Sequence, residues 1–260
     1  MKLNEVMTVL EKIAPVSLSD AFCKKYGMYD NSGIIINCGG EVNGALFSLD
    51  LSINTVNKAK EYGYNLIVTH HPAIYGGISR LDLTRDPQAI ALAECIKCGI
   101  SVISMHLNFD AAPEGIDYHL MQGLGGNKPE ILAPIEGGGY GRVYAVKEEK
   151  FTAFVERVKK TFNSDRVLSY GADKSVKKAA SFCGAGCDDK AIAFAAEKGA
   201  DVFVSSDMKH HEIAALLGRG INVIHLTHYS AESYGFEKIY SRISKELSVP
   251  TLYFYDAELM

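Results

Sequence analysis

Three sequence blocks occur twice in this 260-residue chain, in the same order. The block KAASFCGAGCDD resembles IIINCGGEVNG, and AFAAEKGADVFVSSDMKHHE resembles NKAKEYGYNLIVTHHPAIY. The third pair is GINVIHLTHYSAE and GISVISMHLNFD, each with a histidine four residues before a carboxylate. An ordered repeat of this kind indicates two similar structural units rather than one irregular domain.

Strand-like and helix-like patterns alternate along both copies. In the first copy we predict strands at 33–39 and 45–52 around a turn at Gly39-Gly40, and a helix at 53–63. A buried strand ending at Pro72, a helix at 87–98 and a second buried strand at 100–106 are predicted to follow. This alternation favours an α/β fold with a largely parallel sheet.

The fold that we predict is therefore two similar three-layer α/β lobes related by an internal repeat. We place the first lobe at residues 1–125 and the second at 143–260, with a helix at 151–162. Residues 126–142 are rich in glycine and proline, which predicts a connection between the lobes. Their GGGYGR run could bring backbone amides to a phosphate, but no complete phosphate-binding motif accompanies it.

The composition limits the class of protein. A net charge of −4 and a pI near 6.1 argue against a nucleic-acid binder that depends on its overall field. No apolar run reaches the ~18 residues of a membrane span. The N-terminal residues 1–15 are amphipathic and contain acids, unlike a secretory signal, so we predict a cytoplasmic protein.

The six cysteines lie among apolar neighbours. We expect reduced thiols in or near the core. Cys95 and Cys98 form a C-x-x-C pair in a predicted helix. Without a second pair, the spacing does not predict a structural zinc site.

Polar residues end four of the predicted strands, in VTHHP, SMHLNFD, VSSDMKHH and LTHYSAE. Ligands in α/β sheets bind outside the carboxyl ends of strands, so these residues are candidates for a site in the cleft between the lobes. His70 and His71 are adjacent, and neighbouring residues in extended chain point to opposite sides. The two imidazoles could therefore reach two different metal ions.

Two histidine–acid pairs have helical spacing. His106 precedes Asp110 by four residues, and His228 precedes Glu232 by four. If the chain turns helically there, each pair lies on one face, so either pair could hold one ion or one acid could bridge two. Imidazole nitrogen and carboxylate oxygen suit Zn(II), Fe(II), Mn(II) or Ni(II). The alternative is that these histidines only form structural hydrogen bonds.

The remaining histidines are weaker candidates. His225 lies inside a predicted strand, which favours a core position. His210 and His211 occupy the second copy of the HHP segment, so one of them could line the site. Nearby, Asp207 and Lys209 could form an ion pair.

Almost the whole chain resembles the NIF-three-like family (NGG-one-interacting factor three), whose bacterial members are often labelled GTP cyclohydrolase I type two homologues. The usual D-N-x-G-L ends in Ile34 here, and His210 replaces the tyrosine of D-x-K-Y-H, so that His211 matches the family histidine. The resemblance rests on an ordered series of motifs: DNSGI, VTHHP, HLNFD with AAPEGID, GYGRV, CGAG, SSDMKHHE and THYSAE.

The resemblance implies a dinuclear metal site between two similar lobes. The matching ligands are His70, His71, Asp110, His228 and Glu232, with Glu232 bridging both ions. The chain lacks the domain that some members insert between the lobes. The family also implies a toroidal homohexamer, a trimer of dimers with the metal sites facing the interior.

His106 matches a histidine beside the family's site, either as an extra ligand or as its neighbour. With Glu232, it is our candidate catalytic residue, because an imidazole can orient or carry a proton near neutral pH. The predicted function is a metal-dependent hydrolase acting on a nucleotide or phosphoester. The alternative is a non-catalytic metal-handling protein or a ring-shaped scaffold.

Overall fold

The computed structural model describes residues 1–259 and contains two compact units. The first unit consists of Met1–Ala112 and Phe236–Leu259, and the second of Pro113–Gly235. The second boundary falls inside helix α10 (His228–Ile243). The first unit is therefore discontinuous in sequence, unlike the expected division at 125 and 142.

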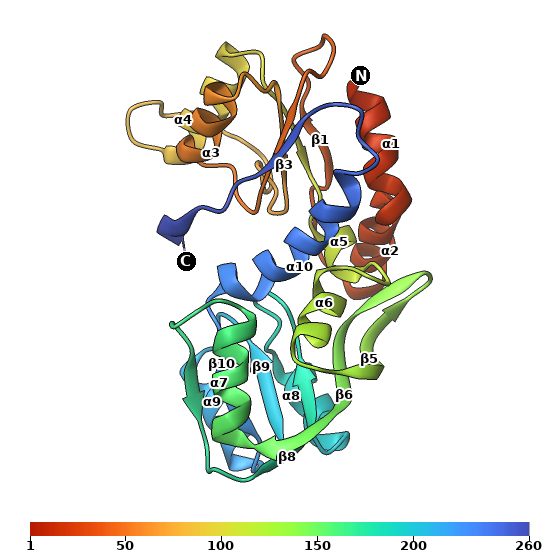
Figure 1. Ribbon diagram of the computed structural model, residues 1–260, viewed down its shortest axis with the longest axis vertical. Helices are drawn as coiled ribbons and strands as arrows, with labels where there is room; N and C mark the ends of the chain where they lie inside the picture. Colours follow the sequence, from red (N-terminus) through yellow and green to blue (C-terminus); the bar gives the residue numbers. More distant parts are fainter. Residues whose placement is uncertain (260) are drawn as a thin grey trace. The chain divides into compact units, whose positions relative to one another are not determined.

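The first unit combines a mostly parallel sheet with helices (Figure 1). Its elements before the boundary are α1 (Leu3–Ile13), α2 (Val16–Tyr26), β1 (Gly33–Ile36), β2 (Ala45–Ser48), α3 (Ile53–Glu61), β3 (Leu66–Thr69), α4 (Pro87–Lys97), β4 (Ser101–Ser104) and α5 (Leu107–Ala111). After the boundary come the end of α10, β11 (Thr251–Tyr253) and the short 3₁₀ helix η1 (Ala257–Leu259).

The strand order of the first sheet is β1-β4-β3-β2-β11. All neighbouring strands are parallel except β1, which runs antiparallel to β4. Strands β1 and β2 both form as predicted, but β4 and β3 lie between them. The predicted turn at Gly39-Gly40 is therefore not a hairpin.

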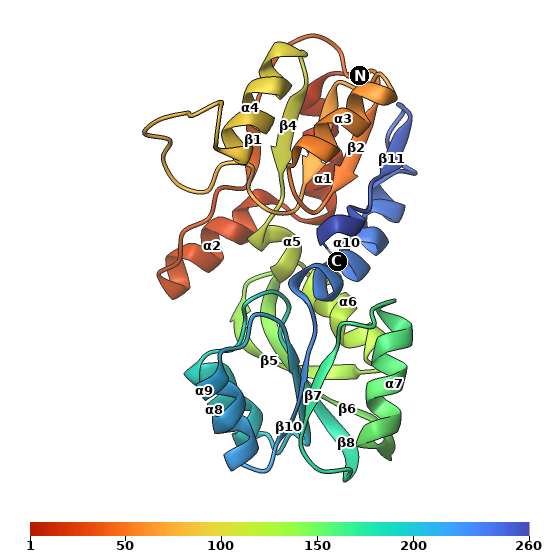
Figure 2. The ribbon, with the colours of Figure 1, turned by 90° about the vertical axis from the view of Figure 1, so that its left-hand side faces the viewer.

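Both faces of the first sheet are covered. Leu46, Ile67 and Val102 are register partners in one row across the strands, and they pack with Val56 of α3 and Leu92 of α4. The next row contains Phe47, which points to the opposite face because side chains alternate along a strand. Helices α3 and α4 lie on one side and α1 on the other (Figures 1 and 2).

The second unit has the same layered plan. Its elements are α6 (Ile116–Gly123), β5 (Asn127–Ile135), β6 (Gly138–Lys150), α7 (Phe151–Thr161), β7 (Leu168–Tyr170), β8 (Ser175–Ser181), α8 (Asp189–Glu197), β9 (Val202–Ser205), α9 (His210–Gly218), β10 (Asn222–His225) and the start of α10.

The second sheet has the strand order β5-β6-β8-β9-β10-β7. Strands β8, β9 and β10 are parallel. Ala180, Phe203 and Val223 form a row that packs with residues of α8 and α9. Helices α8 and α9 lie on one face of this sheet and α7 on the other (Figure 2).

The segment 126–142, which we predicted to connect the lobes, is regular structure within the second unit. It forms most of an antiparallel hairpin, β5 and β6, that extends the second sheet. Only Glu136 and Gly137 separate the two strands, and Gly137 has a φ of +79°. Two-residue hairpin turns need positive φ, which explains the glycine at position 137.

The predicted repeat is confirmed as two α/β units of similar topology. The series β2-α3-β3-α4-β4 matches β8-α8-β9-α9-β10, and an antiparallel strand, β1 or β7, flanks the last strand of each series. One match must be corrected. Strand β8 corresponds to β2, whereas we had matched it to the segment around β1, which runs in the opposite direction.

The cysteines are free thiols as expected, but not all of them lie in or near the core. Within residues 1–259, which include all six, there is no disulfide. Cys38 and Cys98 are exposed, whereas Cys95 and Cys187 are buried. Burial raises the pKa of both buried thiols to about 12, so neither is a reactive thiolate at neutral pH.

Among the described residues, no helix combines the length and apolarity that a membrane span requires.

Replacing Phe47 tests the packing of the first unit. Its side chain is fully buried, and its ring centroid lies 5.1 Å from that of Tyr240 on α10. We expect Phe47→Ala to lower the free energy of unfolding by about 3–5 kcal/mol, as measured by urea denaturation. The exposed Ile96 is the matched control, and Ile96→Ala should change it by less than about 0.5 kcal/mol. Equal losses for both variants would contradict this packing.

Candidate metal centre

The carboxyl ends of three parallel strands bring polar side chains together in the first unit. Ser48, Thr69 and Ser104 are register partners at the ends of β2, β3 and β4. Asp50, His70, His71 and His106 follow within two residues of these ends. Because β1 is antiparallel to β4, the residues before β1, including Asp30, reach the same edge. The site therefore follows directly from the strand directions.

His70, His106 and Asp110 form a group that could hold a metal ion. Each offers one ligand atom, and these atoms lie within 4.8 Å of one another. Nε2 of His70 is 3.5 Å from Oδ1 of Asp110, and both side chains are buried. The turn of α5 places Asp110 beside His106, whose carbonyl accepts the Asp110 N–H at 3.0 Å. The predicted pair on one helical turn is present.

His71 lies next to this group. Its ring centroid is 4.9 Å from that of His70 and 6.0 Å from that of His106. The chain turns here because the N–H groups of both His70 and His71 donate to the carbonyl of Leu49. The first unit therefore gathers three imidazoles and one carboxylate from the predicted set.

A hydrogen bond at Nδ1 fixes each of these imidazoles. Nδ1 of His70 donates to the carbonyl of Met105 at 2.9 Å, because a carbonyl can only accept, and Nε2 of the same ring faces Asp110. Nδ1 of His71 is 2.7 Å from Oδ1 of Asp50. Nδ1 of His106 is 2.7 Å from Oδ1 of Asp30. Imidazoles that ligate metals are held in this way by carboxylates or backbone carbonyls.

Asp30 is a charged acceptor inside the protein. Its side chain is only 1% exposed. Burial would raise its pKa, but hydrogen bonds from His106, Ser19 and Ser32 outweigh burial and hold the pKa of Asp30 far below its usual range. The neighbouring Asn31 donates from Nδ2 to the carbonyl of Ile74 at 2.6 Å, which ties the segment after HHP to this motif. The DNSGI motif thus orients His106 and anchors that segment.

In the second unit, His228 and Glu232 lie together on the first turns of α10. Nε2 of His228 is 3.1 Å from Oε2 of Glu232, and the carboxylate is buried. Nδ1 of His228 is 2.5 Å from Oδ2 of Asp207, which follows β9. Asp207 has a φ of +51°, a conformation that aspartate tolerates better than most residues. This imidazole is therefore held in the same way as those of the first unit.

Three weaker expectations have plain outcomes. Lys209 does not pair with Asp207, because Lys209 bonds to Glu212 at 3.3 Å while Asp207 accepts from His228. His210 and His211 are exposed at the start of α9. His225 is half-buried at the end of β10, and burial lowers its pKa.

Asp30, Asp50 and Asp207 were not predicted from the sequence as acceptors for the site histidines. A usable signal was present, since Ser48-Leu49-Asp50 and Ser205-Ser206-Asp207 each place an aspartate two residues after the last residue of a strand. In both units that strand is the parallel neighbour of the strand that carries the histidine. An aspartate at a strand end is also a common turn residue, which hides the pattern.

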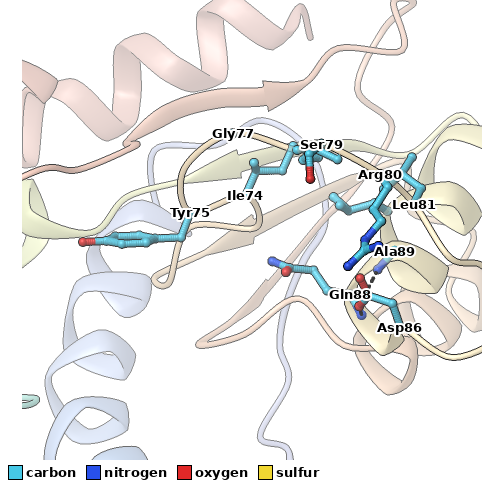
Figure 3. A pocket seen from close by; sticks show the side chains of 11 residues that line it. Ile74, Tyr75, Gly77, Ser79, Arg80, Leu81, Asp86, Gln88 and Ala89 are labelled. Atoms are coloured by element: carbon cyan, nitrogen blue, oxygen red, sulfur yellow. Dashed lines mark hydrogen bonds between the residues drawn. The ribbon is translucent and has the colours of Figure 1, made fainter.

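A pocket of about 270 Å³ lies in the segment between β3 and α4. Figure 3 shows Arg80 and Asp86 together in it, while the ring of Tyr75 points away from them. That ring lies edge-on to His106, with centroids 6.4 Å apart. The lining also includes Ile74, Ile78, Ser79, Leu81, Gln88 and Leu92.

Comparison with known proteins places these features in a family. The family model described as Duf34/NIF3 (NGG1p interacting factor 3) matches residues 1–256. A relative named GTP cyclohydrolase 1 type 2 homolog, from Clostridium perfringens, is 29% identical over 255 residues, which cover 95% of this chain and 93% of the relative.

Two solved structures are similar along nearly the whole chain. A Bacillus cereus protein related to NIF3 has a TM-score of 0.84 at 19% identity, covering 98% of this chain and 97% of that one. Reduced HcgD from Methanocaldococcus jannaschii has a TM-score of 0.81 at 27% identity, covering 97% of each chain. With the family model matching almost every residue, this chain belongs to the Duf34/NIF3 family.

Proposed function

We propose that this protein binds two divalent metal ions and hydrolyses a nucleotide or another phosphoester. The proposed ligands are His70, His71, Asp110, His228 and Glu232, with Glu232 bridging the ions. Each unit alone supplies only part of this set.

The observation that carries the proposal is the hydrogen bond at Nδ1 of each imidazole. His70, His71 and His228 each have this nitrogen within hydrogen-bond distance of a backbone carbonyl or an aspartate. This arrangement leaves Nε2 to bind a cation. A histidine that only stabilises the fold needs no such shared orientation.

Helix α10 continues in sequence from the second unit into the first. Glu232 and Phe236 are four residues apart on this helix, so they lie on one face. The ring centroid of Phe236 is 6.1 Å from that of His70. Phe236, on the part of α10 that belongs to the first unit, therefore packs against an imidazole of that unit's donor set.

The donors fit Zn(II), Fe(II), Mn(II) or Ni(II), because all of them are imidazole nitrogen or carboxylate oxygen. Such ions act as Lewis acids and lower the pKa of water. Within the chain, Asp30 fixes the ring of His106, whose side chain is 21% exposed. His106 can therefore hold or pass a proton at Nε2, or act as an additional ligand.

The substrate class is inferred from charge and from the names of relatives. Arg80 in the pocket after HHP provides a cation for a phosphate or another anion. A guanine nucleotide is the first candidate, because relatives carry the name GTP cyclohydrolase 1 type 2 homolog.

A second candidate function is non-catalytic metal handling by a ring of identical chains. It is favoured by four exposed apolar side chains in the segment after HHP, at Tyr75, Ile78, Leu81 and Leu83. Clustered exposed apolar residues often mark contacts between proteins. The homohexamer and the cytoplasmic location stay predictions.

Elemental analysis of protein purified without an affinity tag tests the metal site. We expect about two divalent ions per chain in the wild type, since the donor set suits a two-metal centre. Fewer ions are expected in Glu232→Ala and in His70→Ala. Glu237 is exposed on the same helix, so Glu237→Ala is the matched control and should bind as the wild type does. A metal-free wild type after loading with each candidate ion would show that the histidines only form structural hydrogen bonds.

The orienting carboxylates provide a second test. We expect Asp50→Asn and Asp207→Asn each to weaken metal affinity about 10-fold to 100-fold, because an amide holds the imidazole less firmly than a carboxylate. Competition with a chromogenic chelator measures this affinity. Asp82→Asn is the control, because Asp82 is exposed and bonds only locally to Thr84 and Arg85. Unchanged affinity in both test variants would remove the proposed role of these hydrogen bonds.

Turnover separates the two candidate functions. Metal-loaded protein should hydrolyse at least one member of a panel of nucleotides and phosphoesters, and chelation or Glu232→Ala should reduce the rate to background. Substrate loss and product formation would be followed by liquid chromatography. Background rates across the panel, together with bound and exchangeable metal, would favour metal handling over catalysis.

A further inference from the structure

Four of the family motifs meet in the second unit in a network of which the proposed chemistry uses only Glu232. Asp117 comes from AAPEGID and Tyr140–Arg142 from GYGRV. Cys183–Gly184 comes from CGAG, and Glu232 from HYSAE. The contacts among them connect a buried ion pair to the proposed bridging carboxylate.

Asp117 is the centre of this network. It lies in the first turn of α6 and is fully buried. One of its oxygens pairs with the guanidinium of Arg142, which is itself only 2% exposed. The same oxygen accepts the N–H of Gly141 at 3.0 Å, and the other accepts the N–H of Cys183 at 3.2 Å. Asp117 thus joins α6, β6 and the turn after β8.

The peptide groups of Cys183 and Gly184 are held on several sides. The hydroxyl of Tyr140 donates to the carbonyl of Cys183, while Asp117 accepts from its N–H. The carbonyl of Gly184 accepts from the hydroxyl of Ser206 at 2.7 Å. The turn therefore has little freedom to move relative to β6 and β9.

Gly184 lies close to the carboxylate of Glu232. A Cβ atom at Gly184 would lie 2.6 Å from Oε1 of Glu232 and 3.6 Å from Nε2 of His228. The first distance is too short for any real contact, so a side chain there would displace the carboxylate. The carboxylate of Glu232 thus occupies the space that a side chain at position 184 would fill.

We propose that Asp117 and Arg142 are positioning residues that fix the carboxylate of Glu232 through the Cys183–Gly184 turn. Neither side chain needs to touch a metal ion or a substrate. This inference rests on the proposed role of Glu232 as a ligand. An apolar pair could fill the same volume, but it could not accept the N–H groups of Gly141 and Cys183.

A substitution at Gly184 tests the turn without touching the ion pair. Gly184→Ala is compared with Gly199→Ala, because both glycines have a positive φ, +57° and +68°, while a Cβ at Gly199 meets nothing within 4 Å. The two variants therefore share the backbone strain and differ in the contact with Glu232. Both are loaded with Co(II), whose visible absorption reports the ligand geometry, and affinity is measured by competition with a chelator.

We expect Gly184→Ala to lower Co(II) affinity about 10-fold to 100-fold and to change the absorption spectrum. Gly199→Ala should have the affinity and spectrum of the wild type. Similar thermal melting of the two variants would show that the difference is not a loss of folding. Wild-type affinity and spectrum in Gly184→Ala would overturn the inference.

Asp117→Asn tests the far end of the network with the same measurements. The amide keeps the shape of the side chain but loses the charge that pairs with Arg142, so we expect the affinity and the spectrum to change in the same direction as in Gly184→Ala. Far-ultraviolet circular dichroism checks folding, and if this variant does not fold, Gly184→Ala alone decides. A wild type that binds no Co(II) would instead reject the metal site, and this inference with it.

Discussion

The hydrogen bond at Nδ1 is the interaction on which the candidate metal centre depends. A neutral imidazole has two tautomers and two flipped orientations, so an unsupported histidine can present either nitrogen. Here Nδ1 of each ring lies within hydrogen-bond distance of one oxygen acceptor. The acceptors are the carbonyl of Met105 and the carboxylates of Asp50, Asp30 and Asp207. Nε2 of each ring is then already oriented to bind a cation, and the ring does not have to rotate first.

The fold provides those acceptors because parallel strands end at the same edge of a sheet. In both units, the strand that carries a site histidine has a parallel neighbour that ends in an aspartate, β2 beside β3 and β9 beside β10. The antiparallel strand β1 supplies the third carboxylate, Asp30, from its opposite end. The repeated βαβ arrangement therefore repeats the backbone and also one hydrogen-bonded pair of an imidazole and a carboxylate.

The histidine doublet and the two histidine–acid pairs could be predicted from sequence, because strand ends and helical spacing determine their local geometry. The β5–β6 hairpin was missed because its glycines and prolines resemble those of a linker, although all but Gly137 of the turn lie within the two strands. The boundary at Gly235 was missed because it lies inside a helix, and β11 is only three residues long. Contacts that depend on tertiary packing, such as the pairing of Asp117 with Arg142, leave no periodic signal.

The discontinuous first unit has a consequence for the order in which the nascent chain can fold. Strand β11 pairs with β2, and Phe236 covers the rings of His70 and Phe109, so the sheet and its imidazole cluster both require residues translated after the entire second unit. The second unit, by contrast, is continuous in sequence and can leave the ribosome whole. During synthesis, the second unit, which contains Glu232, should therefore fold before the first unit, which contains the histidine cluster.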